Sequence, residues 1–473
     1  MKILHYMFGL PPVRDGGLVR YVLDLIEQEA KMGEDVRLLI PGAPALGVNR
    51  KTKILNSRTP YREIRTYEIY HPLPVPMCNG IRHPGLFMQT CGKSAYRSFL
   101  RRLRPDLIHI HTFMGLHREF LAEARRQKIP VLFTSHDYFG ICPTAVLLCG
   151  DRICEDNEWK GCAQCARKAF PVWRLKLEQS AVYRIFRKQE RIVRLAKKLY
   201  VPIRRNSGKH DAGRCRTKAD AVMAGIRGIK AGSVMVSGEY AALRDYYRSM
   251  FRLVSYFHFN SSAASTIYRV RLRGLTVKGS IVPVSHQGIA DCRRKRIFGK
   301  TLRIGYFGSW SMHKGFFDLL KACGRLREKG CVDLELHIYS GTAKRKECFV
   351  RNHSGFGQGQ LAEVFDGIDV LAMPSRWPET FGLAALEAVS FGVPVILPEY
   401  AGAMDLLRAD MRAGFVYDGT VQGLEETIRK IYDNRELLAQ ANAAILRMDM
   451  DFSYERHVRQ ILEIYRKVCA TEK

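Results

Sequence analysis

Long apolar runs are absent from this sequence, and its start lacks the features of a secretory signal. No stretch of about 18 apolar residues occurs, so we expect no membrane-spanning helix. The first residues carry neither an extended basic segment nor a small-residue cleavage site, and we therefore expect a cytosolic protein. No internal repeat of short period is visible.

Acidic residues are scarce relative to basic ones. The sequence holds 76 Lys and Arg against 46 Asp and Glu, a formal net charge of +30. Between residues 166 and 304 the counts are 32 and 7, so most of the excess lies in one central block. Such a block suits nucleic acid, anionic lipid or an acidic substrate, but it also suits a merely soluble basic surface.

Length and composition indicate a globular protein with more than one domain. A chain of 473 residues is too long for one ordinary core, and two domains of about 200 residues or more fit it. Apolar residues make up 47% of the sequence, which is typical of a folded protein.

Apolar periodicity predicts alternating strands and helices in the first half of the chain. The expected elements are strand 2–7, a helix ending at Gly33, strand 35–40, helix 94–104, strand 107–111, helix 115–127, strand 131–135, helix 238–251, strand 253–259 and strand 280–284. Residues 45–90 read as a loop and 172–200 as a basic amphipathic helix, whereas 203–235 give no clear assignment.

The same alternation restarts in the second half. The expected elements are strand 302–307, helix 314–328, strand 334–339, strand 368–373, helix 381–391, strand 393–397 and a final helix, 453–468. Strands that alternate with helices in this way predict a doubly wound parallel sheet in each half.

The segment from Pro374 to Glu387 is the most informative one, because it carries two carboxylates eight positions apart. It follows a predicted strand and opens a predicted helix, for which Thr380 suits the N-cap. Free amides at a helix start bind phosphate well. Glu379 on the turn and Glu387, about 12 Å of helix rise later, are spaced to suit a nucleotide-sugar. Alone, two such glutamates would more often form a solvated face.

This segment resembles the E-x(7)-E signature of retaining glycosyltransferases with the GT-B fold, in particular glycosyltransferase family 4. The resemblance implies an α/β protein with two Rossmann-like doubly wound domains facing across a cleft. The implied boundaries are an acceptor-side domain over 1–285 with a Cys-rich loop, 136–166, and a basic insert, 170–235; a linker over 286–300; a nucleotide-sugar domain over 301–452; and a C-terminal helix, 453–473, that crosses back.

The resemblance also implies the roles of individual residues. Glu379 would hold the transferred sugar and Glu387 the ribose hydroxyls, while Lys314 and the amides after Glu379 would take the charge of the diphosphate. Further donor contacts are expected from Gly16, Gly17, Ser309, Thr380, Phe381, Gly382 and Leu383. Ser309 stands where the family has an Arg, so one of two expected basic partners is missing.

A histidine at the end of strand 107–111 is expected to contact the transferred sugar. The resemblance assigns this role to His111, which with Glu379 completes the predicted catalytic pair. His109 faces the same side of the strand and is the alternative. Without the family context, a satisfied histidine at a strand end would be the simpler interpretation.

The cysteines are numerous, at thirteen, but most are scattered, which argues against a disulfide framework. Five fall within 24 residues: Cys142, Cys149, Cys154, Cys162 and Cys165. One C-x2-C with nearby thiols can form a tetrahedral structural zinc site, for which we favour Cys142, Cys154, Cys162 and Cys165. Reduced buried thiols explain the same pattern.

Together these features predict a hexosyl- or glycosyltransferase that moves a sugar with retention from a nucleoside diphosphate-sugar to a saccharide or lipid-linked acceptor. Its expected context is cell-surface polysaccharide or glycolipid synthesis, with no cofactor obligatory for the chemistry. The basic helix 172–200 favours peripheral contact with an anionic membrane surface. A GT-B sugar-nucleotide epimerase and a basic nucleic-acid-binding protein are the alternatives, although no known motif supports a nucleic-acid partner.

Overall fold

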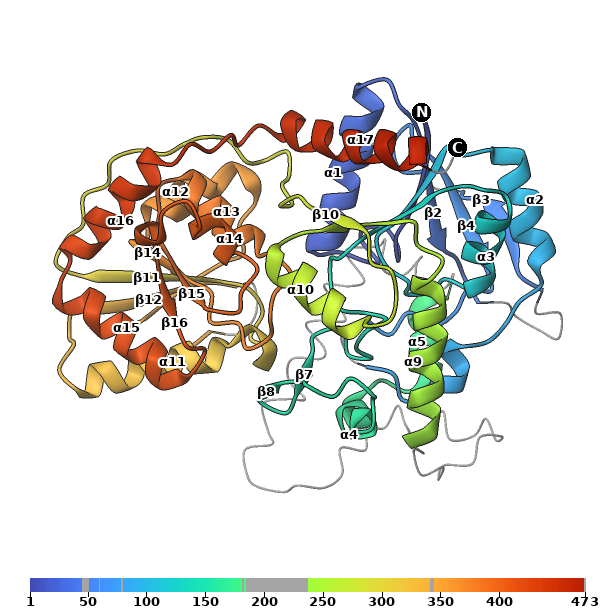
Figure 1. The fold of residues 1–473 in the computed structure, drawn as a ribbon. Helices are drawn as coiled ribbons and strands as arrows, with labels where there is room; N and C mark the ends of the chain where they lie inside the picture. The colour runs from blue at the N-terminus through green and yellow to red at the C-terminus, as the bar shows by residue number, and fades with distance from the viewer. Residues whose placement is uncertain are drawn as a thin grey trace.

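The computed structural model contains two large sheets of mainly parallel strands, each with helices packed against it (Figure 1). It describes residues 1–44, 51–58, 60–77, 80–180, 183, 237–340 and 344–471. Of the predicted basic helix 172–200, the structure describes a helix over Val172–Gln179 that ends before the extended Ser180, so the predicted helix does not continue through Ser180. Residues 181, 182 and 184–200 of that prediction, and the segment 203–235, lie outside the described residues. The arrangement confirms the predicted fold class, an α/β protein with two doubly wound domains.

The first sheet has eight strands in the order β10-β9-β6-β5-β1-β2-β4-β3. Their bounds are β1 (Lys2–Tyr6), β2 (Asp35–Pro41), β3 (Lys53–Asn56), β4 (Arg65–Tyr70), β5 (Leu107–Ile110), β6 (Val131–Thr134), β9 (Tyr256–Phe259) and β10 (Gly279–Ile281). All neighbours pair in parallel except β3, which is antiparallel to β4. The helices of this part are α1 (Gly17–Lys31), α2 (Lys93–Leu103), α3 (Arg118–Arg126), α4 (Cys162–Cys165), α5 (Val172–Gln179), α9 (Ser237–Phe251) and α10 (Ser262–Arg271).

The second sheet has six strands, all parallel, in the order β13-β12-β11-β14-β15-β16. Their bounds are β11 (Leu302–Phe307), β12 (Leu334–Tyr339), β13 (Val350–His353), β14 (Val370–Ala372), β15 (Val395–Pro398) and β16 (Gly414–Tyr417). The helices are α11 (Phe316–Glu328), α12 (Leu361–Asp366), α13 (Leu383–Ser390), α14 (Met404–Leu407), α15 (Val421–Asp433), α16 (Glu436–Arg447) and α17 (Tyr454–Thr471). A small hairpin, β7 (Leu148–Cys149) and β8 (Arg152–Ile153), belongs to the cysteine-rich loop.

The predicted loop over residues 45–90 is wrong, because β3 and β4 lie within it and extend the edge of the first sheet. The side chains of β3 are mostly exposed, so this strand lacks the apolar run by which the buried strands were found. The strands β13 and β16 were missed as well, and both lie at the edges of the second sheet.

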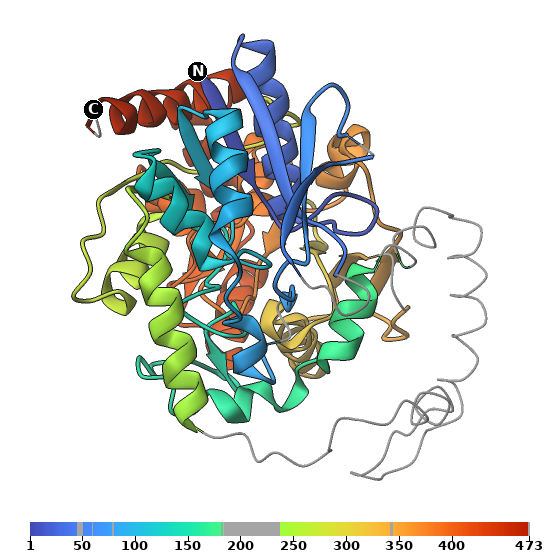
Figure 2. The same cartoon turned by 90° about the vertical axis from the view of Figure 1, so that its right-hand side faces the viewer.

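Helix α17 leaves the second domain and packs on helix α1 of the first (Figures 1 and 2). Apolar residues at helical spacing bury one face of α17: Val458, Ile461, Leu462, Tyr465 and Val468. Two polar contacts cross the same interface: Tyr21 bonds His457 at 3.1 Å, and Tyr465 lies 2.7 Å from a Glu29 carboxylate oxygen. The helix thus fastens the two domains together.

Replacing Ile461 by Ala should destabilise the protein by about 2–5 kcal/mol, because the side chain is fully buried in the interface and its removal leaves a cavity. Urea or thermal unfolding measures this loss. Glu463→Ala, on the exposed face of the same helix, should change stability by no more than about 0.5 kcal/mol. Equal effects of the two substitutions would contradict the packing of α17.

Candidate functional site

A cavity of about 400 Å³ lies between the domains, where the carboxyl ends of both parallel sheets meet. Ligands of open α/β sheets bind at these ends of the strands. Eight of the predicted site residues line it: Gly16, Gly17, Lys314, Glu379, Thr380, Phe381, Gly382 and Leu383. The fold therefore brings most of the predicted catalytic and donor-binding residues together at this cavity.

Three of the predicted catalytic and donor-binding residues do not line this cavity. Ser309 lies on the loop after β11, where its hydroxyl is 3.0 Å from that of Ser311. The His111 ring is buried behind His136, which does reach the cavity, so the assignment of His111 as the direct sugar contact is not supported. Glu387 lies along α13, beyond the cavity wall, and pairs with His286.

Lys314 and Glu379 form the charged centre of the second-domain wall. The ammonium of Lys314 donates to the Glu379 carboxylate at 2.8 Å, and the Ser375 hydroxyl donates to the same oxygen. Burial alone would raise the pKa of Glu379, but the charge and hydrogen bond of Lys314, with the bond from Ser375, bring it below its ordinary value. Glu379 is therefore ionised at neutral pH although it is nearly buried.

The backbone at two glycines allows this arrangement. Gly315 has φ +66°, and a Cβ there would lie 1.6 Å from the Pro374 oxygen, so only glycine lets the Lys314 turn approach the strand end so closely. Gly382, with φ +110°, is the N-cap of α13, so the prediction of Thr380 at this position is wrong. The Thr380 hydroxyl instead donates to the backbone oxygen of His136 across the domain interface.

The start of α13 lies at the cavity, and the amide of Ala385 in its first turn donates to the carbonyl of the N-cap residue Gly382 at 3.0 Å. The helix begins at Leu383, and Leu383 and Ala384 both line the cavity. Amides of the first helical turn lack carbonyl partners within the helix and carry the positive end of its dipole. With Lys314 opposite, this wall can accept the negative charge of a phosphate or diphosphate.

Glu387 belongs to a contact that joins both domains and the segment between them. His286 donates from Nε2 to Glu387 Oε1 at 2.8 Å, because its Nδ1 accepts from Arg20 of helix α1 at 3.0 Å. His286 is fully buried, and the Gly288 amide also donates to its Nδ1. A residue predicted to touch ribose is therefore held in place by a histidine that the sequence did not single out.

The first-domain wall contains residues that the sequence analysis missed. His136 and Asp137 follow strand β6 and line the cavity, as does Tyr21 on α1. Burial raises the pKa of Asp137 to about 6, and the hydrogen bond from the Phe139 amide opposes this only in part. The sequence did contain a pattern that could have identified His136. It follows the end of a predicted strand, within residues 134–137, just as His111 ends the predicted strand 107–111.

The predicted zinc ligands gather in one loop but do not converge on one point. A tetrahedral ion with sulfur at about 2.3 Å needs thiols about 3.8 Å apart. In the described part of the chain, the set of three or more candidate ligand atoms within 4.8 Å of one another is His5, His109 and His111, not the cysteines. Burial and the neighbouring Cys149 raise the pKa of Cys165 to about 12, which favours protonated thiols. The thiols as they stand do not fit a zinc ion, and the zinc remains a prediction.

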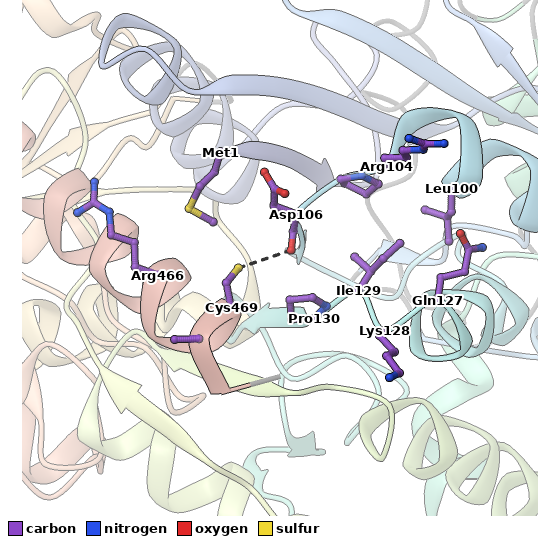
Figure 3. A pocket seen from close by; sticks show the side chains of 12 residues that line it. Met1, Leu100, Arg104, Asp106, Gln127, Lys128, Ile129, Pro130, Arg466 and Cys469 are labelled. Atoms are coloured by element: carbon purple, nitrogen blue, oxygen red, sulfur yellow. Dashed lines mark hydrogen bonds between the residues drawn. The ribbon is translucent and has the colours of Figure 1, made fainter. Parts of the chain in front are cut away.

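A second cavity, of about 760 Å³, lies at the opposite end of the first sheet (Figure 3). Asp106 and Pro130, which precede β5 and β6, line it together with α17 residues such as Cys469. It therefore opens at the amino ends of the strands, where open α/β sheets do not place their ligands. The interdomain cavity is the better candidate for the functional site.

Two family models match the sequence, one in each domain. The model for glycosyltransferase family 4 matches residues 15–198, and that for group 1 glycosyl transferases matches residues 290–447. The matched ranges include the Gly16–Gly17 turn in the first domain and both Glu379 and Glu387 in the second.

Individual proteins support the same assignment at lower coverage. The sequence is 32% identical over 117 residues to a D-inositol 3-phosphate glycosyltransferase of Streptomyces avermitilis, a match covering 24% of this chain and 25% of that protein. The chain thus matches about a quarter of the length of this curated relative.

Solved structures share the fold over nearly the full length. Sucrose-phosphate synthase from Thermosynechococcus elongatus aligns with a TM-score of 0.54 at 13% identity, covering 99% of each chain. Anabaena HepE in complex with UDP and glucose aligns with a TM-score of 0.52 at 14% identity, covering 98% of this chain and 99% of that one. With a family model matching each domain and two facing α/β domains, the chain belongs to the group 1, family 4 glycosyltransferases of the GT-B fold.

Proposed function

We propose that the protein transfers a sugar, with retention, from a nucleoside diphosphate-sugar to a saccharide or lipid-linked acceptor. The observation that carries this proposal is the second-domain wall, where Lys314, the start of α13 and the ionised Glu379 lie together in one interdomain cavity. The pattern suits an anionic leaving group next to a sugar. It favours a transferase over the epimerase and nucleic-acid alternatives, since the family models on both domains are those of transferases.

The charge that develops on the departing diphosphate is the main demand on the site. Lys314 and the first amides of α13 supply positive charge from fixed positions, which stabilises that developing charge without reorganisation. Glu379, held by Lys314 and Ser375, is placed to accept hydrogen bonds from the sugar hydroxyls. The named relatives are consistent with this donor, because HepE is described in complex with UDP and glucose.

The acceptor is expected against the first domain. A further cavity of about 560 Å³ opens at the carboxyl ends of β1, β2 and β4 and shares Phe8 with the donor cavity. Its lining includes Arg14 and Arg58, whose guanidinium groups suit an anionic group on a saccharide, and Glu178, which pairs with Arg14 at 3.7 Å and can accept hydrogen bonds from sugar hydroxyls. The synthesis of a cell-surface polysaccharide or a glycolipid provides acceptors of this kind.

The structure describes the first part of the predicted basic helix, which we expect to meet a membrane with its basic and exposed apolar side chains. On α5, Trp173 and Leu177 are 50% and 48% exposed and lie one helical turn apart, beside Arg174 and Lys176. Exposed apolar side chains flanked by basic ones are typical of helices that lie on anionic lipid. No helix among the described residues is long and apolar enough to span a bilayer.

Nucleotide binding tests the donor site. Thermal unfolding should be measured with UDP, GDP, ADP and CMP, and a ligand at about 100 times its Kd should add roughly 2.7 kcal/mol of stability. We expect a clear shift with one of them, weakened in Glu387→Ala. Glu387→Gln, which can still accept from His286, should retain more of the shift. Folded protein that responds to none of the four would contradict the proposal.

Asp137 predicts a pH dependence of stability. Its folded pKa, about 6, lies above the ordinary value of 3.8, so the folded protein binds more protons and loses stability as pH rises from about 4 to 6. Asp137→Asn should therefore raise stability by about 1–3 kcal/mol at pH 8 and change it little at pH 4. Unfolding at both pH values measures this, with the exposed Asp449→Asn as control. An equal effect of Asp137→Asn at both pH values would contradict the raised pKa.

Liposome flotation tests the membrane contact. The protein should float with vesicles rich in anionic lipid and less with neutral ones, and the double substitution Trp173→Ala, Leu177→Ala should reduce flotation several-fold. Ile297→Ser removes an apolar side chain that is 92% exposed elsewhere, and should have no effect. Equal binding to both vesicle types would remove the membrane from the proposal without affecting the donor site.

A further inference from the structure

A continuous chain of buried polar side chains runs through the first domain and ends at the donor cavity. Its members are the Val282 carbonyl, His258, Thr134, His109, Tyr465, Glu29, His5, His111 and His136. Every side chain except that of His136 is at most 1% exposed. Such groups are stable in a core only when their hydrogen bonds are made, so the position of each proton can be traced.

The first half of the chain begins at a group that can only accept. His258 Nε2 lies 2.7 Å from the Val282 carbonyl oxygen, so Nε2 carries the proton. When the His258 ring is neutral, its Nδ1 accepts from the Thr134 hydroxyl at 2.9 Å. Thr134 has then given its only proton and accepts from His109 Nε2 at 2.6 Å.

The second half passes through the crossing helix α17 to helix α1. His109 Nδ1 lies 2.7 Å from the Tyr465 hydroxyl, which lies 2.7 Å from Glu29 Oε1. The other carboxylate oxygen, Oε2, is 2.8 Å from His5 Nε2. His5 Nδ1 is 3.1 Å from His111 Nε2, and His111 Nδ1 is 3.0 Å from His136 Nε2.

These eight contacts need one proton more than an ionised Glu29 and neutral imidazoles supply. In this count no proton is left for the hydrogen bond between Tyr465 and Glu29. One additional proton, on the Glu29 carboxyl, on His109 or on His258, allows all eight hydrogen bonds to form. In each case the chain has no net charge, as burial requires, and Glu29 Oε2 still accepts from His5. The direction of the last three bonds is therefore the same: His5 donates to Glu29, His111 to His5 and His136 to His111.

The surroundings oppose charged imidazoles at the cavity end. Burial and the neighbouring histidines lower the pKa of His111 and of His136 well below its ordinary value. A metal ion on His5, His109 and His111 would have to replace hydrogen bonds that occupy both nitrogens of all three rings. The two rings nearest the cavity, those of His111 and His136, are accordingly neutral.

We propose that this chain, oriented by Glu29, holds the proton of His136 on Nε2 and presents Nδ1 to the cavity as a hydrogen-bond acceptor for a sugar hydroxyl. The role of the hydroxyl rests on the proposed transferase function, whereas the proton position does not. His136 lines the cavity, and no described residue hydrogen-bonds its Nδ1. Glu29, His5 and His111 are thus positioning residues that act through His136.

The proton position is measurable without substrate. The protein has 14 histidines. Ring ¹⁵N spectra of protein that is labelled only at histidine report which nitrogen of each ring is protonated. The His136 signals are assigned by their loss in His136→Gln. We expect a protonated Nε2 and an unprotonated Nδ1. A proton on Nδ1 in the unsubstituted protein would overturn the proposal.

Two substitutions of Glu29 test its control over His136. Glu29→Gln can donate to Tyr465 and accept from His5, so the His136 signals should stay in place. Glu29→Leu removes the acceptor of His5, and the His136 resonances should shift towards a mixture of both proton positions. His5→Phe breaks the same chain one step later and serves if Glu29→Leu does not fold.

Glu27→Gln is the matched control, because Glu27 lies on the same helix but pairs with Tyr61 and Arg62. Its His136 signals should equal those of the unsubstituted protein. Unchanged signals in folded Glu29→Leu would overturn control by Glu29. A protein with the expected signals that binds no nucleotide would leave the chain intact and contradict only the proposed function.

Discussion

The position of the cavity depends on the contact between helix α17 and the first domain. The cavity exists only where the carboxyl ends of two separate sheets face each other, and the chain passes between the domains at the linker and again before α17. Apolar burial by Ile461 and its neighbours holds the helix on α1, while Tyr465 and His457 add polar contacts of fixed direction. A helix held only by apolar contacts could slide by a turn, whereas these bonds fix its register.

The sequence predicted the central strands of both sheets and not their edges. A strand such as β5 or β14 is covered on both faces, so its residues form an apolar run that stands out. The edge strand β13 reads Val-Arg-Asn-His and exposes two of its four residues. Its composition therefore does not indicate a strand, and it is recognised as one by its hydrogen-bonded pairing with β12. Edge strands therefore escape a pattern that depends on burial.

The candidate site was predictable where its residues lie close in the chain. Glu379 and the start of α13 belong to one strand–turn–helix unit, and Lys314 to another, so local sequence carries their geometry. His136 was missed because the choice between two strand ends, after β5 and after β6, depends on which one reaches the cavity. The contacts behind it join residues such as Glu29 and Tyr465, which are 436 positions apart, and no local pattern encodes them.

The two walls of the cavity differ in a way that matches the two halves of a transfer reaction. The second-domain wall concentrates charge, with an ion pair and a helix start, which suits the leaving diphosphate. The first-domain wall is backed by a buried chain whose members together carry no charge, so it offers hydrogen bonds of fixed direction. Hydroxyl groups need direction more than charge, because each can donate only one proton. The side chains behind this wall therefore contribute fixed hydrogen-bond directions, whereas Asp137 on the wall itself supplies its carboxylate.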